Sequence, residues 1–256
     1  MLETVIALLE AKIPANPAAH EDLEDELLDN ISQYFDAIGS SFPYDKVENI
    51  FFSYATESLR GDVDDVLDPV LAHFRKPFTD SVSSKLTDIY LVGSAEMVEW
   101  GRTKGGRPIY YEGDPMPSAI KYAQKHTANL IKNMDDTTRQ DVRDTISNAI
   151  RDKRGIDGLA RDLRTKFSDM SKNRARTIAR TETCDALEQA FMDRANDMGI
   201  NGKEWVVTLP CEMCAQNAGI ILPLDGVFPS GHDRPPAHPN CRCALAPVII
   251  EDMKNK

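Results

Sequence analysis

Residues 171–199 read SKNRARTIARTETCDALEQAFMDRANDMG, a run in which apolar side chains recur at helical spacing. Its apolar stripe consists of Ala175, Ile178, Ala179, Ala186, Leu187, Ala190 and Phe191. Steps of three and four keep side chains on one face of a helix. Ser171 is the expected N-cap, and Gly199 is the expected stop. The run therefore predicts one long helix with a buried face.

The same helical spacing extends through most of the chain before this run. We expect helices over residues 2–13, 21–39, 44–59, 63–100, 118–134, 136–153 and 157–167. Beyond Gly199 the pattern changes, because KEWVVTL (203–209) and APVII (246–250) are rich in residues that favour strands. The predicted fold class is mainly α, with a small irregular β module at the C-terminal end.

One run rich in glycine and proline interrupts the helices. GRTKGGRPIYYEGDPMP, residues 101–117, contains four glycines and three prolines, which end helices. We therefore expect three parts. These are an acidic helical N-terminal region over 1–100, a linker loop over 101–117, and a helical domain over 118–256 that carries a Cys/His module at 203–250.

The net charge of −11 is unevenly distributed along the chain. Residues 1–100 contain 6 Lys/Arg against 20 Asp/Glu, whereas residues 121–180 contain 15 against 8. A basic segment suits phosphate groups or an acidic protein surface, and a solvated helix face of mixed charge is the alternative. If this segment contacts DNA, the arginines expected to do so are Arg151, Arg154, Arg161 and Arg164.

Residues 211–245, CEMCAQNAGIILPLDGVFPSGHDRPPAHPNCRCAL, hold four of the five cysteines. A chain of 256 residues can bury a core without covalent staples. The start Met1-Leu2-Glu3 has no basic region before an apolar run, and no apolar run reaches the roughly 20 residues of a membrane helix. We therefore expect a reducing cytoplasm, where clustered cysteines bind metal more often than each other. Reduced free thiols and a disulfide are the alternatives.

The spacing of these residues suits zinc. Cys211 and Cys214 form a C-x2-C pair, and the H-x2-C-x-C cluster of His238, Cys241 and Cys243 follows. Zinc takes four such ligands in a tetrahedron, and four protein ligands make the ion structural rather than catalytic. The predicted ligands are Cys211, Cys214 and Cys241, with either His238 or Cys243 as the fourth.

Three stretches give the chain a resemblance to a known family. RARTIARTETCDALEQA, DGVFPSG and PPAHPNCRC resemble the phage Mu F-like minor head proteins, the portal-associated head morphogenesis proteins of tailed phages. The resemblance covers roughly residues 118–248, and its anchors are IARTE at 178–182 and HPNCRC at 238–243. In many members other residues replace the first cysteine pair, so the resemblance by itself does not imply zinc.

This resemblance implies a structural protein present in few copies at the portal vertex, inside the head of the virion. During assembly it would lie in the host cytoplasm, and it can leave the head with the genome. Its implied role is to assist head assembly. The implied partners are the portal protein, scaffolding or capsid protein, and packaged double-stranded DNA bound without sequence preference, with no membrane involved.

An enzymatic alternative is a metal-dependent nuclease of the ββα-metal type that acts on phage DNA. His232, His238 and Asn240 could supply a base beside a metal that holds phosphate. That fold requires a helix after the histidine and the asparagine, whereas Cys243 leads into the apolar run APVII. We therefore expect a protein that is not an enzyme.

The two family anchors are expected to contact each other. Glu182 falls within the apolar stripe of its helix, and a buried carboxylate needs a cationic or hydrogen-bonding partner. Arg242 lies between two predicted zinc ligands. We predict a structural latch in which Glu182 binds Arg242, while Arg180 and Thr181 hydrogen-bond nearby loop groups. A Glu182 side chain that bends out to solvent is the alternative.

Overall fold

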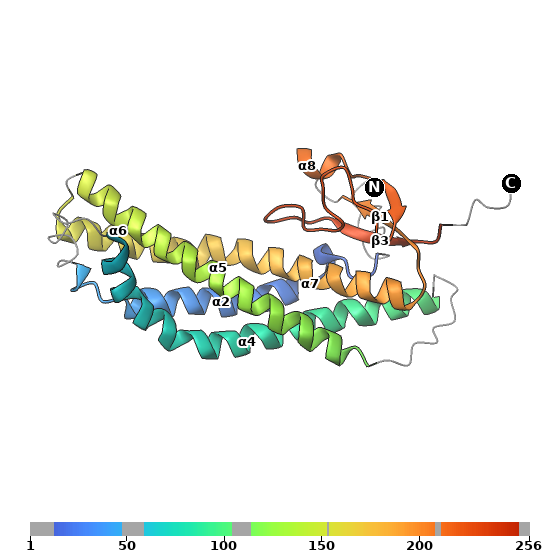
Figure 1. Ribbon diagram of the computed structural model, residues 1–256, viewed down its shortest axis with the longest axis horizontal. Helices are drawn as coiled ribbons and strands as arrows, with labels where there is room; N and C mark the ends of the chain where they lie inside the picture. Colours follow the sequence, from blue (N-terminus) through green and yellow to red (C-terminus); the bar gives the residue numbers. More distant parts are fainter. Residues whose placement is uncertain (1–12, 48–58, 104–113, 153, 208–210, 251–256) are drawn as a thin grey trace. The chain divides into compact units, whose positions relative to one another are not determined.

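The structure is a computed structural model that describes residues 13–47, 59–103, 114–152, 154–207 and 211–250 (Figure 1). Most of these residues are helical, and three short strands follow the long helices in the chain. The predicted fold class, mainly α with a small β module at the C-terminal end, is confirmed. The helices predicted over 2–13 and 44–59, and the predicted linker loop 101–117, lie largely outside the described residues.

The long helices are α2 (Glu21–Ser41), α4 (Leu59–Thr103), α5 (Met116–Arg151), α6 (Ile156–Asp169) and α7 (Ala175–Asp197). A short 3-10 turn η1 (Pro17–Ala19) precedes α2, and a π-helical turn η3 (Met170–Arg174) joins α6 to α7. The C-terminal module contains β1 (Gly202–Val206), α8 (Glu212–Ala215), β2 (Ile221–Pro223) and β3 (Ala244–Val248). The helices predicted over 21–39 and 63–100 are thus confirmed as parts of α2 and α4.

Helix α5 is one helix where the sequence predicted two. The two predicted helices, 118–134 and 136–153, were divided at residue 135, but Asp135 is a buried residue inside α5. Its carboxylate accepts a hydrogen bond from the Tyr34 hydroxyl at 2.8 Å and pairs with Arg75 at 2.6 Å. A buried carboxylate with two such partners is stable within a helix, so the break is unnecessary.

The start of α7 also differs from the prediction. Ser171, the predicted N-cap, lies inside the π-helical turn η3, and its carbonyl accepts a hydrogen bond from Ser32 at 2.9 Å. A π turn inserts one extra residue and lets a helix continue where a cap was expected. The other end was predicted correctly, because Gly199 has a positive φ of 66° just after α7.

The chain forms two compact units, and neither is a single stretch of sequence. Unit 1 consists of Met1–Leu27, Ser84–Ala123 and Thr177–Lys256, and unit 2 of Leu28–Ser83 and Gln124–Arg176. The division of the chain at 101–117 remains a prediction, since most of that run is not described.

The core of unit 2 depends on aromatic packing and a close helix contact. Tyr34 stacks on Phe78 with ring centroids 4.0 Å apart. A Cβ at Gly39 of α2 would lie 2.9 Å from Cβ of Phe167 on α6, so this contact requires a glycine. In unit 1, Tyr90 of α4 packs with small residues of α5 and α7, and its hydroxyl donates to Asp193 at 2.5 Å.

The C-terminal module is a three-stranded antiparallel sheet in the order β2-β1-β3. Trp205 on the central strand is fully buried, and its ring meets Phe228 edge-on at 4.9 Å. The short strand β2 was not predicted, because its sequence ILP lacks a recognisable alternation. The sheet places the two cysteine-bearing loops at one end of the module, directly after β1 and directly before β3.

Helix α7 covers the outer edge of β3. Pro247 has no N–H and pairs with Lys203, so the alternation of antiparallel pairing turns the N–H of Leu245 outward. That N–H donates to both carboxylate oxygens of Glu188, each at 3.2 Å. Burial raises the pKa of Glu188 well above its usual range, although the Leu245 hydrogen bond opposes the shift. The buried carboxylate thus attaches the module to α7 and leaves no free donor at that position.

Candidate metal centre

The first cysteine pair lies at the start of helix α8. Cys211 is the N-cap, and its sulfur accepts a hydrogen bond from the backbone N–H of Cys214 at 3.4 Å. The first N–H groups of a helix have no partner within the helix, which is why a cap accepts there. This hydrogen bond lowers the pKa of the Cys211 thiol. Cys211 is exposed, whereas Cys214 is buried.

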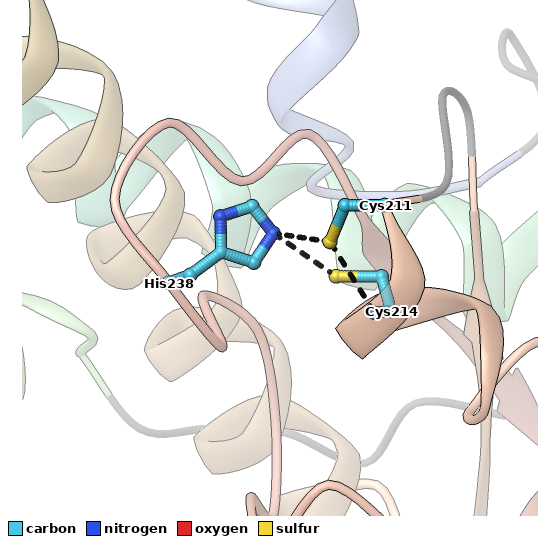
Figure 2. Close-up of side chains that lie close together, drawn as sticks. All are labelled: Cys211, Cys214 and His238. Atoms are coloured by element: carbon cyan, nitrogen blue, oxygen red, sulfur yellow. Dashed lines mark hydrogen bonds between the residues drawn. The ribbon is translucent and has the colours of Figure 1, made fainter.

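The imidazole of His238 faces both of these sulfurs (Figure 2). Its Nε2 lies 3.1 Å from Sγ of Cys211 and 3.2 Å from Sγ of Cys214. Its Nδ1 lies 2.7 Å from the carbonyl oxygen of Pro239. Because a carbonyl only accepts, Nδ1 donates to it, so in the neutral form of the ring the lone pair is at Nε2. This is the arrangement of a histidine prepared to bind a metal.

Two further cysteines complete the cluster. Sγ of Cys241 lies 3.8 Å from Sγ of Cys214. The sulfurs of Cys214, Cys241 and Cys243 all lie within 4.8 Å of one another, as do the ligand atoms of Cys211, Cys214 and His238. Asn240 turns the chain with a positive φ of 62°, a conformation that asparagine tolerates better than most residues. The five predicted ligand residues are therefore brought together in one place.

The electrostatics of the cluster favour a mixture of thiolate and thiol. A hydrogen bond from Cys243 lowers the pKa of Cys241 to about 5, with backbone N–H groups contributing, and the same interaction raises the pKa of Cys243. Burial raises the pKa of Cys214 to about 12. The sulfurs of Cys214 and Cys243 therefore hold their protons, and a bound cation could replace those protons.

The cluster also fits the geometry of a tetrahedral ion. With Zn–S near 2.3 Å and Zn–N near 2.0 Å, tetrahedral sulfurs lie about 3.8 Å apart, and sulfur and nitrogen about 3.5 Å apart. The Cys214 to Cys241 distance of 3.8 Å matches the first value, and the His238 contacts of 3.1 and 3.2 Å lie within about half an ångström of the second. These residues have the donors and the spacing to hold a metal ion.

Arg242 attaches the metal loop to helix α2. Its guanidinium pairs with Glu24 at 2.8 Å and lies 3.9 Å from Glu21. The structure thus gives Arg242 a carboxylate partner, Glu24, that the sequence did not predict, and the predicted pairing of Arg242 with Glu182 stays a prediction. Arg180 pairs with the same carboxylate at 3.2 Å. Glu182 is half-buried on α7.

The two family anchors meet through hydrogen bonds. The backbone N–H of Asn240 donates to the Thr181 hydroxyl at 3.2 Å, and the Asn240 amide donates to the Thr177 hydroxyl at 3.2 Å. The thiol of Cys184 lies 3.9 Å from the carbonyl oxygen of Cys243. The HPNCRC loop is thus hydrogen-bonded to helix α7 at and next to the IARTE segment.

Sequence reasoning did not identify several residues that hold this region. Glu24 and Glu188 each looked like an ordinary helix residue. Arg234 was also missed, although it pairs with Asp185 at 3.0 Å and donates to Gln189 at 2.9 Å. The only available signal was an arginine beside two prolines in a loop, which cannot reveal its partner.

The residues of the nuclease alternative are arranged differently from that fold. Nδ1 of His232 lies 3.1 Å from the carbonyl oxygen of Ser230, within its own loop. The segment that follows Cys243 is strand β3, where a ββα-metal site requires a helix. Among the described residues, the His/Cys groups that could hold a metal contain His238 and not His232.

All four arginines predicted to contact DNA are exposed and belong to unit 2. Arg151 pairs with Asp152 at 3.1 Å, and Arg154 pairs with Asp162 at 2.5 Å. The guanidinium of Arg164 lies 4.4 Å from the centre of the Tyr44 ring. The local positive charge is therefore partly neutralised. Across the described part of the chain, every helix is too short or too polar to span a bilayer.

The fold and the cluster define a mainly helical protein whose C-terminal β module is organised around thiols and an imidazole. Residues 140–246 match the family model described as Phage Mu protein F like protein. This region includes both anchors and all five cluster residues, and over it the chain is phage Mu F-like, as the resemblance predicted. Over this region the chain is similar to phage Mu F-like proteins, a similarity that points to a phage head-related protein. No curated protein and no solved structure matches the chain.

Proposed function

We propose that this protein is a structural minor head protein of a tailed phage. It would associate with the portal vertex inside the head, assist head assembly, and lie in the host cytoplasm until assembly. The observation that carries this proposal is the match of residues 140–246 to the phage Mu F-like family. The portal protein is the proposed main partner, with scaffolding or capsid protein as a further contact.

Within this proposal the Cys/His cluster binds zinc as a structural ion. Cys211, Cys214 and Cys241 would be three ligands and His238 the fourth. Contacts of 3.1, 3.2 and 3.8 Å join these four side chains, and none of these contacts involves Cys243. A full set of protein ligands leaves no position open for a substrate, so the ion would cross-link the loops of the module. This supports a role in which the chain breaks no bond.

Association with the portal is tested in particles of the phage that encodes the protein. We expect the protein to be present in purified heads in fewer copies than the major capsid protein, and chemical cross-linking to join it to the portal protein. Isolated portal should also retain the purified protein in a sedimentation assay. A protein that is absent from purified heads, or that ignores the portal in both assays, would contradict this proposal.

The exposed arginines of unit 2 are proposed to contact packaged DNA. Binding should be independent of sequence and should weaken steeply with salt, because each phosphate contact releases a counterion. Replacing Arg151, Arg154, Arg161 and Arg164 by glutamate should reduce the slope of log affinity against log salt by about 4, if each arginine contacts one phosphate. Fluorescence anisotropy with labelled random duplexes measures this slope.

A control reverses three exposed basic residues outside segment 121–180, namely Lys46, Lys76 and Arg102. Because these residues lie outside the proposed surface, each reversed charge should cost only the non-local part of the attraction. An equal loss per reversed charge in the two variants would contradict a localised DNA surface. Cleavage of the duplex on addition of a divalent metal would instead favour the nuclease alternative.

A further inference from the structure

A single buried carboxylate joins the proposed zinc loop to two helices of unit 1. Arg242 lies in the chain between Cys241 and Cys243, and its guanidinium approaches both oxygens of Glu24, at 2.8 and 3.4 Å. Arg180 of α7 approaches the same carboxylate at 3.2 Å. Glu24 is only 5% exposed, so water contributes little to its solvation. The carboxylate depends on the two guanidinium groups for its stabilisation.

Glu24 occupies a position that favours a negative charge. It lies in the first turn of α2, where unpaired backbone N–H groups attract carboxylates. Burial of one carboxylate with two guanidinium groups leaves the arginines only limited freedom, because a guanidinium pairs with a carboxylate in a defined plane. The position of Arg242, and with it the backbone between two cysteines, is therefore set from α2.

We infer that Glu24 is a positioning residue for the zinc site, and that zinc binding in turn holds the first turn of α2. The inference rests on the proposed zinc site. If Glu24 favours the loop conformation in which Cys241 faces Cys214, it raises the zinc affinity without contacting the ion. Linkage then requires that zinc stabilises the Glu24 contacts by the same factor.

Other contacts hold the same loop, so the loss of Glu24 should weaken zinc binding rather than abolish it. Asn240 remains bonded to Thr181 and Thr177, and Leu245 remains bonded to Glu188. Partners outside the ligand shell of a metal typically contribute 10- to 100-fold to its affinity. We expect Glu24→Gln to weaken zinc binding by about 10-fold, toward the lower end of that range.

The experiment measures zinc affinity by competition with a chromophoric chelator, in the full chain. The matched control is Glu21→Gln, which removes the same charge from the same helix turn. Glu21 lies 3.9 Å from Arg242, and its side chain is 77% exposed, so the control should change zinc affinity by less than about 5-fold. Arg242→Gln should weaken binding as Glu24→Gln does, and it provides a second variant if the first folds poorly.

Hydrogen exchange gives a readout that a general loss of stability would not produce. In the wild type, zinc should slow amide exchange in the first turn of α2, whereas in Arg242→Gln zinc should leave that turn unchanged. A folded Glu24→Gln protein with wild-type zinc affinity would overturn this inference and leave the zinc site intact. A wild type that binds no zinc would overturn the proposed zinc site, and the inference with it.

Discussion

Removal of zinc is expected to shift the emission of Trp205 to longer wavelength while the far-ultraviolet signal of the helices largely remains. Trp205 is fully buried in the module that the zinc loops enclose, and it packs on Phe228 of one of those loops. Structural zinc contributes about 10–16 kcal/mol of apparent binding free energy in small zinc-finger peptides. A module with a three-stranded sheet has few other interactions of that size, so Trp205 should become solvated.

This experiment compares metal-bound protein with protein treated with a chelator, by fluorescence and circular dichroism. The chain has two tryptophans, so a Trp100→Phe background isolates the signal of Trp205. In that background, a Cys211→Ser, Cys214→Ser double variant should emit at long wavelength from the start and should not respond to chelator. Protein that contains no metal and yet has a blue-shifted, buried Trp205 would contradict the structural role of zinc.

His238→Ala is expected to reduce zinc affinity by more than the ~10- to 100-fold that loss of a partner outside the ligand shell costs. Nε2 of His238 already faces the sulfurs of Cys211 and Cys214, and the Pro239 carbonyl holds the proton on the opposite nitrogen. Cys243→Ser should retain stoichiometric zinc. Titration with Co²⁺ reports the ligand set directly, because the thiolate charge-transfer absorption should correspond to three sulfurs and remain unchanged in Cys243→Ser.

The matched control for this prediction is His232→Ala. It removes the other histidine of the segment, whose Nδ1 bonds within its own loop at Ser230, and it should leave the Co²⁺ spectrum unchanged. The opposite pattern, in which His238→Ala retains the ion and Cys243→Ser loses it, would assign the fourth position to Cys243. Retention of the metal in both variants would mean that the fifth residue substitutes for the missing ligand.

Local periodicity was sufficient to predict much of the helical fold. The apolar stripe of 171–199 repeats every three to four residues, and α7 is found where that stripe lies. The stop at Gly199 could be predicted because glycine adopts a positive φ without strain. The π-helical turn before α7 could not be predicted, because Ser171 has the chemistry of a cap, whereas in the structure it lies within the turn and its carbonyl bonds to Ser32.

The Cys/His cluster could also be predicted from local sequence. The carboxylate that binds its loop could not. Two cysteines three residues apart and a histidine near two more cysteines are close in sequence, so spacing alone brings them together. The prediction that Glu182 binds Arg242 rests on their places in the two family anchors, and it stays a prediction. The observed partner Glu24 is 218 residues from Arg242, and nothing in its local sequence distinguishes it from neighbouring acidic residues. Such a contact depends on which helices meet in the folded chain.

The discontinuous composition of unit 1 has a consequence for the order in which the protein matures on the ribosome. Unit 1 combines Met1–Leu27 with Ser84–Ala123 and Thr177–Lys256. The first turn of α2, which carries Glu24, is therefore synthesised long before the other residues of unit 1. Until Arg180 and Arg242 have been synthesised, the carboxylate of Glu24 lacks both of its guanidinium partners. The cysteines and the histidine of the proposed zinc site are also synthesised after the first turn of α2. The proposed site can therefore load only after Cys241 has been made, and a chain that ends before Arg242 could not form the Arg242–Glu24 pair.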